Sequence, residues 1–158
     1  MGEATYYLKA WFKDQAAAKA ALPGIKRLIS EGIEAQDWWQ QHRGMEREGD
    51  RAQFWEQFEA KFPMTVKYLE SFRAGRCGGK HSLLGGDCNN DLAGFLDFGG
   101  REDDVENVIL EGIELRYSAT VWHFAHWDPL VAFLELEFGA EETGWVSDEY
   151  LDPYDSIL

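Results

Sequence analysis

A glycine-rich stretch at residues 74–91, AGRCGGKHSLLGGDCNND, gathers the side chains best suited to hold a metal ion. Thiolates bind zinc, and alternating oxygen side chains begin a calcium loop. The groups of these two kinds are Cys77, Cys88, Asp87, Asn89 and Asp91. The cysteine spacing matches no paired zinc pattern, and Leu92 stands where a calcium loop requires glycine. We therefore expect no metal site and no cofactor, and we interpret 87–91 as an Asx-rich turn.

The same stretch carries a small cationic group formed by Arg76, Lys80 and His81. Glycines beside basic residues are typical of a phosphate cradle, but that motif needs glycine at Ala74 and Ser or Thr at His81. A nucleotide-binding loop is therefore rejected. The three basic side chains remain the predicted site of a small anionic ligand under an alternative in which the protein is a ligand-binding domain or an enzyme.

His123 and His126 are the other side chains with catalytic potential. His123 continues the apolar face of a predicted strand, which favours a role at the edge of the core. The chain contains neither G-x-S-x-G nor H-E-x-x-H, the motifs of a nucleophile elbow and of a zinc protease. We assign no catalytic residue, so the sequence favours a non-enzymatic protein and leaves catalysis open.

Carboxylates and aromatic rings are interspersed through the C-terminal segment, residues 141–158, which contains no Lys or Arg. Such carboxylates can meet a basic partner while the rings fill its pockets. The predicted partner-binding residues of this segment are Glu141, Glu142, Trp145, Asp148, Glu149, Asp152 and Asp155. The competing interpretation is a solvated tail whose rings fold back onto the sheet.

Two adjacent tryptophans, Trp38 and Trp39, complete the predicted binding set. Neighbouring side chains on a helix point about 100° apart, so at least one ring can enter the core. The other can stay exposed as an anchor, because tryptophan is enriched at the energetic centres of interfaces.

Charge is divided unevenly along the chain. Residues 1–75 hold 11 Lys/Arg and 11 Asp/Glu, whereas residues 76–158 hold 4 against 18, so the whole net charge of -14 belongs to the second part. A one-sided excess of this kind sets up a directional field that attracts a cationic partner. It also disfavours direct attachment to nucleic acid, because backbone phosphates would be repelled.

The leading hypothesis is a non-enzymatic acidic protein that binds a basic nuclease or another nucleic-acid-binding protein. An inhibitor, an immunity protein, an antitoxin and a mimic of DNA charge are forms of this function. Two alternatives stay open. One is a ferredoxin-like domain or enzyme that binds a small anionic ligand or a metal, and the other is a subunit of a larger assembly. The oligomeric state is left open.

The elements that must position these groups begin with a strand over 5–12, rich in β-branched and aromatic residues. Asp14 then caps a helix that Pro23 bends or breaks and that closes near Gly32. A short helical piece follows and carries the tryptophan pair. Phenylalanines spaced four residues apart predict a helix over 54–62, and a further helix is expected over 64–72.

Alternation of apolar and polar residues predicts most of the second part. The pattern at 105–111 fits a helix and a strand equally well. The other elements are a strand over 92–98, a strand over 113–121, a helix from a cap at Asp128 to Gly139, and a strand over 143–146.

The resulting order of elements is that of a ferredoxin-like split βαβ, β-α-β-β-α-β, with a helical insertion in the first crossover of an antiparallel α+β sheet. We expect one domain over 1–158. Its core comprises 4–32 and 92–147. The other segments are a helical insert at 34–73, the glycine-rich loop at 74–91 and an acidic tail at 147–158. No apolar run reaches the roughly 20 residues of a membrane span, so a cytoplasmic protein is expected.

Overall fold

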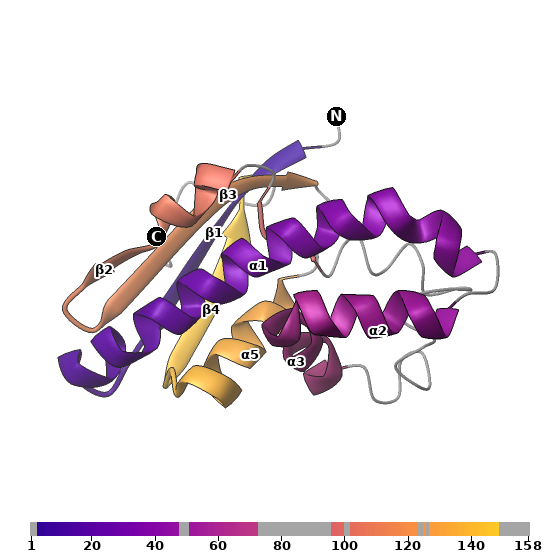
Figure 1. Ribbon diagram of the computed structural model, residues 1–158. Helices are drawn as coiled ribbons and strands as arrows, with labels where there is room; N and C mark the ends of the chain where they lie inside the picture. The colour runs from indigo at the N-terminus through magenta and orange to yellow at the C-terminus, as the bar shows by residue number, and fades with distance from the viewer. Residues whose placement is uncertain are drawn as a thin grey trace.

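The computed structural model describes residues 3–47, 51–72, 96–99, 102–122, 125 and 127–148. Their fold is α+β, with a four-stranded antiparallel sheet in the order β2-β3-β1-β4. Helices α1 and α5 lie against the sheet, and α2 and α3 lie beside the far part of α1 (Figure 1).

Strand β1 (Glu3–Trp11) is central and pairs with β3 (Glu114–Trp122) on one side and β4 (Glu142–Ser147) on the other. In both central strands buried residues alternate with more exposed ones, so one face of each strand enters the core. Tyr6, Leu8 and Ala10 of β1 are buried together with alternate residues of β3. The predicted strands 5–12, 113–121 and 143–146 therefore correspond to β1, β3 and β4.

Helix α1 (Gln15–Arg47) runs without a break through Pro23, so the expected end near Gly32 is wrong. The positive backbone φ that a glycine helix end requires is absent at Gly32. A Cβ atom there would instead overlap the ring of Phe98. Glycine at this position therefore permits close packing of α1 on the segment 96–99, and the helix continues through the tryptophan pair.

Two short helices follow, α2 (Arg51–Lys61) and α3 (Pro63–Phe72). Phe54 and Phe58 of α2 are fully buried, and Phe62 between the two helices is nearly so. Glu31 of α1 accepts a hydrogen bond of 2.8 Å from the backbone N–H of Thr65, in the first turn of α3. A buried carboxylate on one helix thus caps the next, which fixes the α2–α3 corner against α1.

The strand expected over 92–98 is wrong for its described part, Leu96–Phe98, which is buried but irregular. Residues 92–95 lie outside the described residues. The carbonyl oxygens of Asp97 and Phe98 accept hydrogen bonds from the Trp127 indole (2.8 Å) and the Tyr117 hydroxyl (2.6 Å). Side chains thus satisfy these backbone acceptors in place of a neighbouring strand.

The ambiguous stretch 105–111 is divided between two structures. A 3-10 helix, η3 (Glu102–Asn107), ends just before the short strand β2 (Ile109–Glu111). Helix α5 (Asp128–Phe138) ends at Gly139, whose φ of 75° is the left-handed conformation that glycine favours. The expected cap at Asp128 is wrong: Trp127 occupies the cap position without a side-chain hydrogen bond, and Asp128 begins the helix.

Candidate partner-binding surface

Much of the predicted ligand chemistry lies outside the described residues. These groups are Arg76, Lys80, His81, Cys77, Cys88, Asp87, Asn89 and Asp91 in the glycine-rich stretch, His123 and His126, and Glu149, Asp152 and Asp155 in the tail. Among the residues that the structure describes, no group of three or more His, Cys, Asp or Glu side chains is arranged to hold a metal ion.

Five exposed carboxylates line the side of the molecule formed by α5 and β4, and we call them the acidic edge. They are Asp128, Glu135, Glu141, Glu142 and Asp148. None of the five forms an ion pair with a cation in the described part of the chain. Two come from α5 and three from β4 and its two ends. Glu142 pairs with Trp11, next to the pair formed by buried Ala10 and Thr143, so its side chain projects from the sheet face opposite α5. The five carboxylates therefore border one edge of the sheet from both of its faces.

Backbone hydrogen bonds at both ends of β4 hold this edge against β1. The Glu141 N–H donates to the Trp11 carbonyl (2.8 Å), and the Asp148 N–H donates to the Thr5 carbonyl (2.9 Å). The Thr5 N–H donates in return to the Asp148 carboxylate (3.2 Å). The Thr143 hydroxyl donates to Glu135 and joins β4 to α5. The three carboxylates of β4 and its ends are therefore attached to a strand whose position is fixed, and α5, which carries the other two, is bonded to that strand.

Two other carboxylates of the second part, Glu114 and Glu137, are paired with cations. Glu114 contacts both Arg116 and Lys9 at 3.3 Å, and the hydrogen bond from Arg116, helped by Lys9, lowers the pKa of Glu114. Glu137 of α5 pairs with Lys67 of α3 at 2.6 Å. Residues 102–148 nevertheless contain 12 Asp/Glu and a single Lys/Arg, Arg116, so these pairs remove only a small share of the excess.

Trp145, predicted as a partner-binding ring, connects β4 to its neighbours. Its ring stacks on Tyr6 with centroids 4.8 Å apart, and its indole N–H donates to Asp128 at 2.7 Å. The side chain is half-buried. The structure thus places Trp145 beside the acidic edge, where it positions one of the five carboxylates.

The two adjacent tryptophans occupy different environments. Trp39 is 2% exposed and belongs to the hydrophobic core. Trp38 is half-buried, and its ring stacks on His42 with centroids 4.1 Å apart. Phe54 packs against the same indole at 5.0 Å. Trp38 is thus the member of the pair that reaches the surface.

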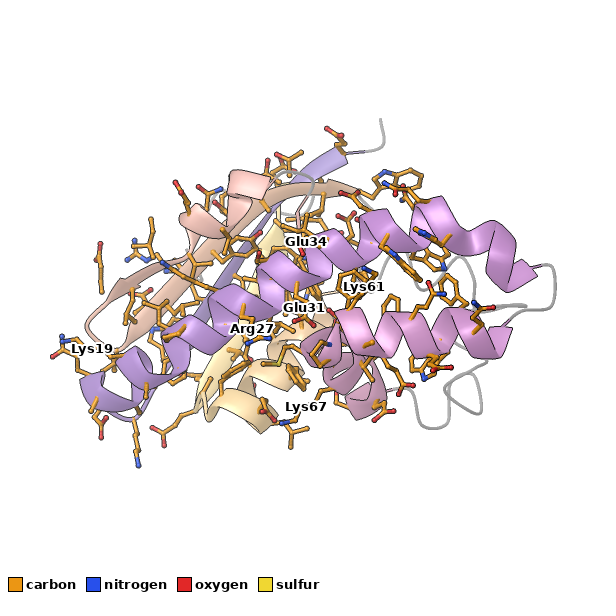
Figure 2. The ribbon with its side chains drawn as sticks, viewed as in Figure 1. Lys19, Arg27, Glu31, Glu34, Lys61 and Lys67 are labelled. Carbon is orange, nitrogen blue, oxygen red and sulfur yellow. The ribbon has the colours of Figure 1, made fainter. Side chains whose placement is uncertain are left out.

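Trp38 lies in an open groove of about 410 Å³ between α1 and the α2–α3 corner. The groove is lined by Glu34, Asp37, Trp38, Gln41, Lys61 and Phe62. In Figure 2, Glu34 lies on α1 and Lys61 on the α2 side. The sequence prediction missed Glu34, Asp37 and Lys61 because it ended the helix near Gly32. The spacing of 34, 38 and 41 on one continuous helix is the pattern that identifies them.

Asp97 is a buried carboxylate, 6% exposed, whose Oδ2 accepts the Trp122 backbone N–H at 2.8 Å. Burial raises the pKa of Asp97 to about 6, against the lowering effect of that hydrogen bond, and nearby Glu3 adds to the rise. Among the described residues, no nucleophile or basic side chain bonds to this carboxylate, which points to a structural role.

No protein-family model, no curated protein and no solved structure matches this chain. Among the described helices, none combines the length and the apolar character that crossing a bilayer requires.

Proposed function

We propose that this protein is a non-enzymatic acidic binding protein and that the acidic edge docks onto a basic partner. The observation that carries the proposal is the set of five exposed carboxylates on α5 and β4 that have no cationic partner among the described residues. Unpaired surface charge of one sign accelerates the encounter with an oppositely charged surface and selects against partners of like charge.

The partner class follows from the sign of the charge. A nuclease or another nucleic-acid-binding protein presents Lys and Arg to bind phosphates, and the same groups would accept this edge. The protein would then act as an inhibitor, immunity protein or antitoxin by occupying the partner's cationic site. Nucleic acid itself is disfavoured as the direct ligand, because its phosphates and the carboxylates repel each other. A cytoplasmic location is part of the proposal.

The charge density of the edge favours simple electrostatic docking over close imitation of a duplex. Glu142 and Asp148 are six residues apart, which is about 20 Å along a strand. Five carboxylates over that length give roughly one charge per 4 Å, whereas duplex DNA carries one per about 1.7 Å of axis. DNA mimicry would therefore require carboxylates beyond this edge.

We further infer that the fold is a ferredoxin-like split βαβ with α2 and α3 inserted in the first crossover. The order of elements and the antiparallel strand order β2-β3-β1-β4 support this assignment. A fold of this kind carries no function by itself, so the proposed activity depends on the edge alone.

Affinity capture with matched charge variants tests the proposal. The edge variant E135Q/E141Q/E142Q loses three unpaired carboxylates, and the control E56Q/E70Q/E106Q loses three exposed carboxylates elsewhere. Wild type and control should retain a basic nucleic-acid-processing protein at low salt and release it near 1 M salt, where the screening length is about 3 Å. The association rate of that protein with the edge variant should be about tenfold lower. Equal rates for both variants would rule out the acidic edge as the docking surface.

A further inference from the structure

The groove beside Trp38 combines negative charge with an aromatic ring. Glu34, Asp37, Trp38 and Gln41 come from one side of α1, spaced three or four residues apart, and Lys61 and Phe62 face them from the α2–α3 corner. Both carboxylates are exposed and form no ion pair with a described cation. Two described cations on α1 and α3 are already engaged, Arg27 with Glu31 at 3.6 Å and Lys67 with Glu137 at 2.6 Å.

The indole of Trp38 is held in one place. His42 stacks on it, and the His42 Nδ1 lies 2.9 Å from the carbonyl oxygen of Trp38. Phe54, Phe58 and Phe62 surround it at centroid distances of 5.0, 6.0 and 6.1 Å. A fixed and partly exposed indole beside two carboxylates favours a cation, because the ring face attracts positive charge and the carboxylates pair with it.

The size and openness of the groove identify the occupant. A space of about 410 Å³ has room for a long side chain. Free small ligands are usually buried over most of their surface, which an open groove does not provide, so a side chain anchored by the rest of a partner fits better. Guanidinium is planar, stacks on aromatic rings and forms paired hydrogen bonds with carboxylates, whereas ammonium is a compact, strongly hydrated charge.

We infer that this groove receives an arginine side chain of the basic partner, with its guanidinium against the exposed part of the Trp38 indole that His42 leaves uncovered and between Glu34 and Asp37. The inference rests on the proposed function, because the acidic edge would supply the remaining contacts. Lys61 lies on the groove wall, and its positive charge repels the incoming cation. Its removal should therefore strengthen binding, which is the opposite of the effect of removing either carboxylate.

An NMR titration with N-acetyl-arginine amide tests the groove without the partner. The chain has seven tryptophans, so the indole N–H resonance of Trp38 is first assigned from the variant W38F. The Trp38 resonance should shift in a saturable manner, with a dissociation constant on the order of 1 mM or weaker for so small a probe. N-acetyl-citrulline amide, a neutral molecule of nearly the same shape, should leave it unchanged. Equal shifts with both probes would overturn the inference.

Substitutions in the groove test whether binding of the arginine probe depends on the charges that line it. E34Q/D37N should weaken the arginine probe about fivefold or more, whereas the two-charge control E56Q/E70Q should bind it as wild type does. K61Q should bind the probe more tightly than wild type. An equal loss of affinity in the control, or weaker binding of the probe by K61Q, would show that the groove does not bind the probe through its positive charge.

The two proposals fail separately. The edge variant E135Q/E141Q/E142Q should bind the arginine probe as wild type does, even though it loses the partner. If the probe binds in the groove but E34Q/D37N captures the partner unchanged, the groove inference is wrong and the proposed function stands. If the edge variant retains the partner while the probe results hold, the acidic edge is wrong and the groove remains a cation site.

Discussion

Asp97 is the most deeply buried carboxylate among the described residues, and its ionisation works against folding. Its pKa rises from an ordinary value of 3.8 to about 6, chiefly through burial. Between these two values the native state keeps a proton that the unfolded chain has lost. The free energy of unfolding therefore falls as pH rises through this window, and the full cost is present above pH 6.

The variant D97N removes this titration. Relative to wild type, it should gain stability between about pH 4 and pH 7, by as much as about 3 kcal/mol for a shift of roughly two pKa units. Asparagine keeps an oxygen that can accept the Trp122 N–H. Urea unfolding at a series of pH values measures the difference. A difference that stays constant across the window would contradict this account.

At the scale of the element, α1 contains two glycines that pack closely against aromatic rings. Replacing each by alanine is expected to change the stability in opposite directions. A Cβ atom at Gly32 would overlap the ring of Phe98, which is fully buried, while one at Gly24 would meet the outer edge of the half-buried Phe138 ring. Alanine favours a helix over glycine by about 1 kcal/mol. At Gly24 the Phe138 ring can move aside, so the higher helix propensity of alanine can stabilise α1. At Gly32 the buried Phe98 ring has no room to move, so an added methyl group would be overpacked.

We therefore expect G32A to lower the free energy of unfolding by about 1–3 kcal/mol, as overpacking does in other cores. G24A should be neutral or stabilising by up to about 1 kcal/mol. Both are measured by urea denaturation, each serving as the other's control. A G32A variant at least as stable as wild type would show that the Phe98 ring adapts freely.

The same positions explain how far sequence reasoning reaches. Richness in β-branched and aromatic residues identified β1, alternation identified β3, and the end of α5 at Gly139 was confirmed, because each depends on local pattern and conformation. The continuity of α1 depends on a ring more than 60 positions away, so no local pattern could reveal it. The groove was missed for that reason: it exists only when 34, 38 and 41 share one helix with a second helix opposite.

For the whole molecule, a net charge of -14 opposes compaction, since folding brings like charges together. Added salt should therefore raise the melting temperature, by about 2–4 °C for each 1 kcal/mol of repulsion that is screened. The edge variant E135Q/E141Q/E142Q should respond to salt less than the control E56Q/E70Q/E106Q. All three edge positions belong to the acidic second part of the chain, whereas two of the control positions belong to residues 1–75, where acidic and basic residues are equal in number. Differential scanning calorimetry in low and moderate salt decides the point. An equal response would mean that the edge carries no special share of the repulsion.

Helix α1 has 33 residues and is about 50 Å long, whereas the nine residues of β1 extend about 30 Å. The part of α1 that passes beyond the sheet runs alongside α2 instead (Figure 1). Helix α1 thus packs against both the sheet and the aromatic cluster formed by Trp38, Phe54, Phe58 and Phe62. Separating α1 from either the sheet or the aromatic cluster would expose about half of the helix to water. The sheet and the cluster are therefore expected to unfold as one cooperative unit.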